Sequence, residues 1–96
     1  MYARLTNFPL RPGSRARIET IMDKYAMLIA GQPGHRGSTF CFDATGSTFT
    51  TLTVWASRAE AEAGPAALRD TAQQEMGDLL AGVPITQVLE VYEPRK

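Results

Sequence analysis

The sequence predicts an α+β fold whose elements follow the order βαββαβ. Four segments alternate in polarity or are rich in β-branched residues, which is typical of half-buried strands. Two segments between them repeat apolar residues at spacings of three and four, which indicates amphipathic helices. Clusters of Gly and Pro separate these segments. The length of 96 residues favours one domain spanning residues 1–96.

The first strand and the first helix are expected at residues 2–8 and 14–30. Ser14 suits the N-cap position, because its hydroxyl can accept a hydrogen bond from a free backbone N–H. Gly31 suits the position just after the helix. The apolar stripe of this helix consists of Ile18, Ile21, Met22, Tyr25, Leu28 and Ile29.

The two central strands, residues 36–43 and 47–56, form a hairpin around the turn at residues 43–46. One register places three Phe side chains and the only Trp on the same face, whereas a slip of one residue scatters them. In that register Phe42 faces Phe49, Phe40 faces Thr51, Ser38 faces Thr53, and Arg36 faces Trp55.

A second helix begins after Ser57, which forms a capping box with Glu60. Residues 64–65, Gly-Pro, are expected to interrupt this helix, and a further helical segment ends at Gly82. Its apolar stripe consists of Leu68, Ala72, Met76, Leu79 and Leu80. The last strand is expected at residues 85–92.

This order is the ferredoxin-like pattern, an antiparallel four-stranded sheet with both helices on one face. Both faces of the later strands are apolar, as Leu52 and Val54 on one side and Phe49 and Trp55 on the other show. Because the helices cover only one face, we expect a homodimer in which a second copy covers the other through sheet-to-sheet packing.

Composition excludes several function classes. Ten basic and ten acidic residues leave no basic footprint for nucleic acid and no polybasic membrane anchor. Cys41 and His35 are single residues of their kinds, so we expect no metal site. The N-terminus begins a strand without a signal peptide and the apolar runs are too short to span a bilayer, which predicts a cytoplasmic protein.

The strand at residues 52–58, with its Trp, its helix-capping Ser and Glu60 beyond, resembles the antibiotic biosynthesis monooxygenase family. The Pro-Gly pair at residues 12–13 and the element order extend this resemblance over nearly the whole chain. The resemblance implies a dimeric α+β barrel. The superfamily includes cofactor-free oxygenases of phenolic polyketides, quinol monooxygenases, haem-degrading oxygenases and members without an assigned reaction. The haem-degrading branch needs a His in the second helical region, and residues 57–82 contain none.

The resemblance implies that Trp55 lines a cavity between sheet and helices, although a packed core residue is the alternative. It also implies Asn7 as a hydrogen-bond donor to the substrate, whereas the haem-degrading branch places this Asn at Thr6, on the opposite face. His35 is the natural acid or base at neutral pH, and Arg36 could stabilise an oxyanion, although both also fit a solvated surface.

The remaining candidates are aromatic, hydroxyl and sulfur side chains that a flat aromatic ligand could contact, or that simply fill the core. These substrate-binding candidates are Phe40, Phe42, Phe49, Thr51, Thr53, Met22, Tyr25 and Met76.

Two functions follow. The first is a cofactor-independent monooxygenase that deprotonates a small phenol or hydroquinone and lets the anion pass an electron to oxygen. Here His35 takes the proton, Trp55 forms the wall, and Arg36 or Asn7 stabilises the anion. The second is a non-catalytic dimer that binds a small apolar ligand, for which an aromatic compound is one possibility. A scaffold with a solid interior is a further alternative, because function depends on the site and not on the fold.

Overall fold

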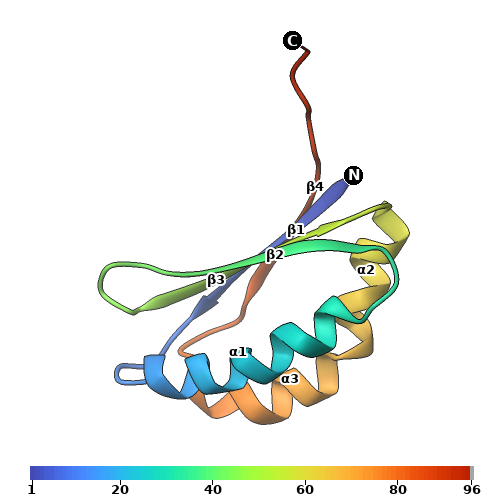
Figure 1. The fold of residues 1–96 in the computed structure, drawn as a ribbon. Helices are drawn as coiled ribbons and strands as arrows, with labels where there is room; N and C mark the ends of the chain where they lie inside the picture. The colour runs from blue at the N-terminus through green and yellow to red at the C-terminus, as the bar shows by residue number, and fades with distance from the viewer. Residues whose placement is uncertain (96) are drawn as a thin grey trace.

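The computed structural model describes residues 1–95 and contains the predicted βαββαβ order. The elements are β1 (Tyr2–Pro9), α1 (Arg15–Ala30), β2 (His35–Phe42), β3 (Thr48–Trp55), α2 (Arg58–Ala67), α3 (Arg69–Met76), the short 3₁₀ helix η1 (Gly77–Leu79) and β4 (Ile85–Glu90). The strands form one sheet in the order β2-β3-β1-β4, and every neighbouring pair is antiparallel. The helices lie on one side of this sheet (Figure 1), which confirms the predicted fold class.

The register of the β2–β3 hairpin is confirmed over most of its length. Phe42 pairs with Phe49, and Phe40 pairs with Thr51. At the open end the prediction is wrong, because the register shifts between His35 and Gly37 and His35 pairs with Trp55. Such a bulge inserts one unpaired residue into a strand. Arg36 is this extra residue, and its side chain is exposed.

Two apolar clusters pack between the sheet and the helices. The larger one surrounds Phe49, which is fully buried and has the rings of Phe8, Phe40 and Phe42 at centroid distances of 5.9, 6.2 and 4.8 Å. The smaller one surrounds Trp55, also fully buried, between α1 and α2. Tyr25 packs against both clusters. The buried members are Leu10, Ile18, Met22, Phe49, Met76 and Leu79 in the first and Ile29, Trp55 and Ala61 in the second.

The predicted interruption at residues 64–65 is wrong. Helix α2 continues through Gly64 and Pro65 to Ala67, and the break falls at Leu68, whose φ is −110°. Gly64 is required by packing: a Cβ there would lie 2.3 Å from Cη2 of Trp55. Pro65 supplies no backbone N–H to the helix. Gly64 nevertheless packs against the buried indole of Trp55 in the same turn, a tertiary contact that local sequence signals do not reveal.

The two predicted N-caps differ. The Ser57 hydroxyl accepts a hydrogen bond from the Glu60 N–H at 3.2 Å, as expected. Ser14 makes no capping bond, and its hydroxyl instead donates to the Leu79 carbonyl at 3.5 Å, so that it ties the start of α1 to η1. Gly31 has a right-handed backbone, and the left-handed turn into β2 is made by Gly34, whose φ is +81°.

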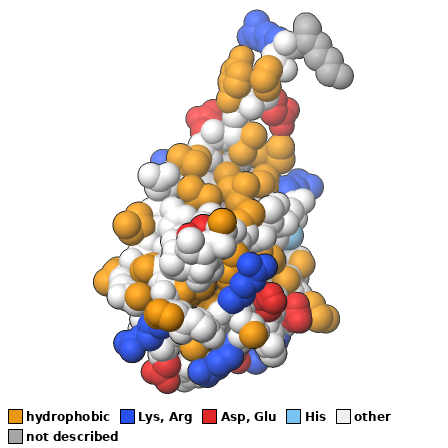
Figure 2. All heavy atoms as spheres, turned by 90° about the vertical axis from the view of Figure 1, so that its left-hand side faces the viewer, with side chains coloured by type: hydrophobic (Ala, Val, Ile, Leu, Met, Phe, Trp, Pro, Cys, Tyr) orange, Lys and Arg blue, Asp and Glu red, His pale blue; other side chains and the backbone are white. Residues whose placement is uncertain are grey.

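Charged side chains of both signs are mixed with hydrophobic ones over the face of the molecule seen in Figure 2. Within residues 1–95, no helix is both long and apolar enough to cross a membrane.

Candidate functional site

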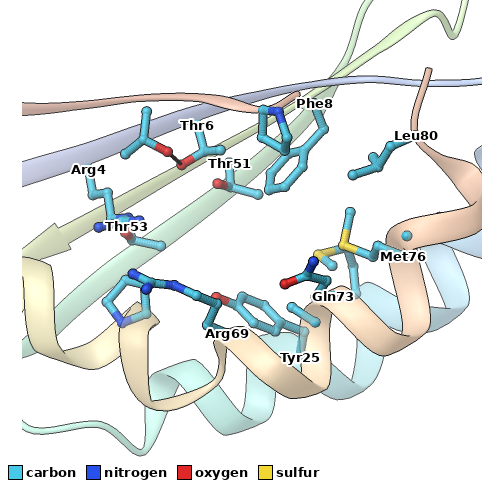
Figure 3. Close-up of a pocket in the computed structure, with 16 residues that line it drawn as sticks. Arg4, Thr6, Phe8, Tyr25, Thr51, Thr53, Arg69, Gln73, Met76 and Leu80 are labelled. Atoms are coloured by element: carbon cyan, nitrogen blue, oxygen red, sulfur yellow. Dashed lines mark hydrogen bonds between the residues drawn. The ribbon is translucent and has the colours of Figure 1, made fainter. Parts of the chain in front are cut away.

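A pocket of about 340 Å³ lies between the sheet and the helices (Figure 3). Ligand pockets for small molecules usually occupy about 300–1,000 Å³, so this one can hold a compact ring system. It is lined by Arg4, Thr6, Phe8, Met22, Tyr25, Thr51, Thr53, Pro65, Arg69, Ala72, Gln73, Met76, Gly77, Leu80, Pro84 and Thr86.

Strand alternation explains the floor of the pocket. Side chains two residues apart share one face of a strand, so Arg4, Thr6 and Phe8 of β1 all point to the helices. Their β3 partners Thr53 and Thr51 face the same way, opposite Arg4 and Thr6. This face is therefore a row of hydroxyl groups with an arginine at one end and a phenylalanine at the other.

The helices form the roof and the mouth. Met22 and Tyr25 come from α1, one turn apart, and Arg69, Gln73 and Met76 come from the same side of α3. Arg69 and Gln73 are exposed, whereas Met76 is buried. Since the lining residue Thr86 of β4 is exposed as well, the pocket opens to solvent between α3 and β4.

The two ends of the pocket differ in chemistry. Figure 3 shows Phe8, Leu80 and Met76 together at one end. Arg4 and Arg69 lie at the other end, one descending from the sheet and one rising from α3, with Thr53 and the Tyr25 hydroxyl beside them. An apolar body with one charged end fits this space.

Arg4 is half-buried, and burial lowers the pKa of its guanidinium; the charge of Arg69 lowers it further, while Tyr25 and Glu62 act in the opposite direction. Arginine nonetheless stays protonated in proteins. Glu62 is engaged elsewhere, accepting from Nε of Arg58 at 3.3 Å. Among the described residues, neither Arg4 nor Arg69 forms an ion pair. The arginine end of the pocket is thus positive and has no carboxylate bound to it.

Burial raises the pKa of the Tyr25 phenol, and the nearby Arg4 offsets this only in part. The phenol therefore remains neutral near pH 7 and can donate a hydrogen bond into the pocket.

Thr53 connects the pocket with the buried indole. Nε1 of Trp55 donates to Oγ1 of Thr53 at 2.8 Å. A hydroxyl has one proton to donate, and the indole can only donate, so the Thr53 proton is free for another acceptor. Further along the floor, the hydroxyls of Thr6 and Thr86 are 3.0 Å apart and bonded to each other.

The structure places part of the predicted set in this pocket. The lining includes Thr51, Thr53, Met22, Tyr25 and Met76. The three phenylalanines Phe40, Phe42 and Phe49 belong to the adjacent core cluster and do not line it. Trp55 is fully buried behind Thr53, so it is the core residue of the two alternatives.

The other three predicted catalytic residues lie elsewhere. His35 has its ring edge on Trp55, with centroids 5.4 Å apart, and its Nε2 is 2.7 Å from Oγ of Ser38. Asn7 lies on the sheet face away from the helices, where its Oδ1 accepts from Oγ1 of Thr50 at 2.6 Å. Arg36 is exposed at the bulge. The structure does not bring these side chains to the pocket.

Sequence reasoning missed Arg4, Arg69 and Gln73. The available signal was the alternation of side chains along a strand. In an antiparallel pair Arg4 lies opposite Thr53, so its side chain shares the helix-facing side with those of Thr51 and Thr53. An arginine on the inward face of a strand is unusual unless it has a partner.

Within residues 1–95 there is no group of three His, Cys, Asp or Glu side chains that could hold a metal ion.

The fold is shared with solved oxygenase structures. A candidate antibiotic biosynthesis monooxygenase from Bordetella bronchiseptica superposes with a TM-score of 0.83 at 14% identity, covering 96% of this chain and 97% of that one. The monooxygenase ActVA-Orf6 of Streptomyces coelicolor, solved with the ligand nanaomycin D, gives 0.78 at 17% identity, with 99% and 90% covered.

SnoaB, a cofactor-independent oxygenase from Streptomyces nogalater, gives a TM-score of 0.80 at 16% identity, with 97% of this chain and 94% of that chain covered. No family model and no curated protein sequence matches the chain. The likeness therefore establishes the fold, as the resemblance in the sequence predicted, and leaves the activity to the site.

Proposed function

We propose that this protein is a cofactor-independent monooxygenase of the antibiotic biosynthesis type, and that it oxidises a small electron-rich aromatic compound in the pocket between sheet and helices. One observation carries the proposal: an apolar pocket ends at Arg4 and Arg69, which no carboxylate neutralises among the described residues. Two proteins with this fold are a monooxygenase that binds nanaomycin D and a cofactor-independent oxygenase, which supports the same chemistry here.

The reaction begins with loss of a proton from the substrate. The resulting carbanion or phenolate passes one electron to oxygen, and the substrate radical and superoxide combine to a peroxide anion. This anion takes back one proton from water and becomes a hydroperoxide. Loss of water then leaves a carbonyl, so that R₂CH₂ and O₂ give R₂C=O and H₂O. The positive end of the pocket stabilises the anion, because a nearby opposite charge favours the ionised form.

None of the lining residues is a His, Asp or Glu, so no ordinary base faces the pocket. We therefore assign deprotonation to the electrostatic field of Arg4 and Arg69, which lowers the pKa of the substrate, and water at the open mouth takes the proton. His35, the base expected from the sequence, is replaced in this role. Tyr25 donates a hydrogen bond to the anion from the roof.

We also propose that two copies close sheet to sheet into a barrel. The face away from the helices carries Leu5, Leu52, Val54 and Leu89, and Leu89 is 45% exposed in one protomer. On this face Oδ1 of Asn7 accepts a hydrogen bond from Oγ1 of Thr50, so these two polar atoms are already paired within one protomer. The cytoplasmic location and the single-domain organisation expected from the sequence remain predictions.

Oxygen uptake tests the proposal directly. We would add anthrone or a naphthohydroquinone to purified protein in the presence of a chelator and without added cofactor, and correct for autoxidation. Saturable uptake that falls about tenfold or more in Arg4→Gln, but not in Arg17→Gln on the exposed side of α1, supports it. Saturable binding without uptake would establish the ligand-binding alternative, which the lack of a base in the pocket also favours.

A further inference from the structure

We propose that the pocket selects aromatic acids: Arg4, Arg69 and the hydroxyl of Thr53 bind a carboxylate of the ligand, while its rings lie against the apolar end. This deepens the proposed function and uses the same pocket, but it concerns binding and does not require that any reaction takes place.

The first argument is unbalanced charge. Removing a guanidinium from water is unfavourable unless an anion or acceptors replace the water. Arg4 is half-buried on the pocket floor, and Arg69 stands at the mouth on the same side. Burial lowers the pKa of Arg4 and the carboxylate of Glu62 acts in the opposite direction, but this carboxylate forms an ion pair with Arg58. An anionic ligand would supply the charge that the described residues do not.

The second argument is geometry. Arg4 descends from β1 and Arg69 rises from α3, so the two guanidinium groups approach the same end from opposite walls (Figure 3). A planar group between these walls can accept hydrogen bonds from both sides. A carboxylate has two oxygens that match the fork of donors on a guanidinium, and charge-assisted bonds of this kind are the strong ones.

The third argument is the free proton of Thr53. Its oxygen accepts from Trp55, which leaves its O–H available to donate to a ligand oxygen, and Thr53 lines the pocket opposite Arg4 in the strand register. Chained hydrogen bonds polarise one another, so the indole N–H strengthens Thr53 as a donor. Trp55 is thus a positioning residue, acting on the ligand through Thr53.

The charge count narrows the substrate class further. The carboxylate of the ligand neutralises one of the two guanidinium charges. The other positive charge remains for a second anion nearby. In the proposed reaction that second anion is the ionised phenol or enol. The matching substrate is therefore an aromatic acid whose acidic hydroxyl lies close to its carboxylate.

Calorimetric titration with 2-naphthoate and 2-naphthamide tests this inference, because the two probes differ in charge but hardly in shape. Neither is oxidised, so turnover plays no part. We expect the acid to bind about tenfold to a hundredfold more tightly than the amide. Equal affinities, or no binding of the acid at millimolar concentration, would overturn the inference.

Single substitutions show which arginine causes the preference for the acid over the amide. In Arg4→Gln the ratio of acid to amide affinity falls about tenfold or more, and in Arg69→Gln it falls by a smaller factor because the exposed guanidinium is screened by solvent. Arg17→Gln is the matched control on α1 and keeps the ratio of the natural sequence. A ratio that survives in both pocket variants would contradict the assignment.

The role of Trp55 has its own readout. Thr53→Val lowers the ratio of acid to amide affinity, while the affinity for the amide stays the same. Thr53→Ser keeps this ratio. Trp55→Phe lowers the ratio by less than Thr53→Val does. An equal loss of acid and amide binding would mean that these residues only hold the fold. The two proposals fail separately: acid selectivity without oxygen uptake refutes the reaction alone, and uptake without acid selectivity refutes only the carboxylate site.

Discussion

The indole N–H of Trp55 donates to the hydroxyl of Thr53 at 2.8 Å, two residues back along β3. Both side chains are buried, Trp55 completely and Thr53 to 5% exposure. Trp55 packs beneath α2, whereas Thr53 lines the pocket. This one bond therefore joins the packing of the second helix to the chemistry of the pocket wall, and it can be tested through stability.

Thr53→Val removes the acceptor at nearly constant volume and leaves a buried indole N–H without a partner. We expect a loss of about 1–3 kcal/mol in the free energy of unfolding. Trp55→Phe removes the donor together with much of the indole volume, so it should cost about as much or more. Guanidinium unfolding followed by far-UV circular dichroism measures both, because Trp fluorescence is lost in one of the variants.

The double variant separates the bond from the packing. Once Phe occupies position 55, Thr53→Val no longer strands an N–H, so it should cost less than in the natural sequence. A coupling free energy of about 1 kcal/mol between positions 53 and 55 is expected. Strictly additive losses would show that the hydrogen bond adds nothing to stability.

Gly64→Ala should destabilise the protein, although the same change stabilises most helices by about 0.5–1 kcal/mol. The reason is contact: a Cβ at Gly64 would lie 2.3 Å from Cη2 and 2.5 Å from Cζ3 of Trp55, so α2 must move away from the sheet. We expect a loss of about 1–3 kcal/mol, as for other overpacked sites.

Gly77→Ala is the control for this prediction. Gly77 also has a right-handed backbone, at the end of α3, and no atom lies within 4 Å of a Cβ built there. Its variant should be as stable as the natural sequence or slightly more stable. If both variants behaved alike in chemical unfolding, the packing of Gly64 on Trp55 would not be the cause.

The fold could be predicted because its signals are local. Alternation and helical spacing located the strands and α1. The three phenylalanines determined the hairpin register, since a slip of one residue would place those of the two strands on opposite faces. The bulge at Arg36 was missed because no apolar residue marks the face at residues 35–37. Helix α2 continues through Pro65 where Gly64 packs against Trp55, and that tertiary contact is not visible in the sequence.

The site was predictable only in part, for a related reason. Of the residues predicted from alternation along β3 and from helical spacing, Thr51, Thr53, Met22, Tyr25 and Met76 line the pocket. Alternation along a strand gives the face on which a side chain lies, but it does not distinguish a side chain that lines a pocket from one that fills a core. For this reason Phe49 was predicted to be part of the site. Arg69 joins Arg4 only through the position of α3 over the sheet, and no spacing in the sequence encodes that.

Asp43 should make the hairpin turn sensitive to acid. Its carboxylate accepts hydrogen bonds from the Thr48 N–H at 3.0 Å and from the hydroxyls of Thr45 and Ser47 at 2.8 and 2.9 Å. The backbone bond from Thr48 is the largest cause of a lowered pKa, about 2 against an ordinary 3.8, and the two hydroxyls add to it.

Because the folded-state pKa is the lower one, the unfolded chain binds more protons between these values. The stabilisation by Asp43 is therefore complete above about pH 4 and is lost as the pH falls toward 2. Urea unfolding of the natural sequence and of Asp43→Asn at pH 5, 3 and 2 checks this. The stability difference between the two proteins should shrink as the pH falls, and a constant difference would exclude a titrating Asp43 as its source.

The proposed sheet-to-sheet dimer makes Leu52 a sensitive position. Leu52 pairs with Leu5 in the middle of the face away from the helices. Leu52→Glu would bury an unpaired carboxylate in the interface, which costs several kcal/mol and should dissociate the dimer. Light scattering after size exclusion would then give a mass near the 10.5 kDa of one chain, against twice that for the natural sequence.

Met27→Glu is the matched control, because Met27 is 78% exposed on α1, on the helix side of the sheet. It introduces the same charge at an exposed apolar residue and should leave the dimer intact. Circular dichroism of both variants ensures that a change in mass reflects dissociation and not unfolding. A monomeric natural sequence at micromolar concentration, or a Leu52→Glu variant that stays dimeric, would show that this face does not pair with a second copy.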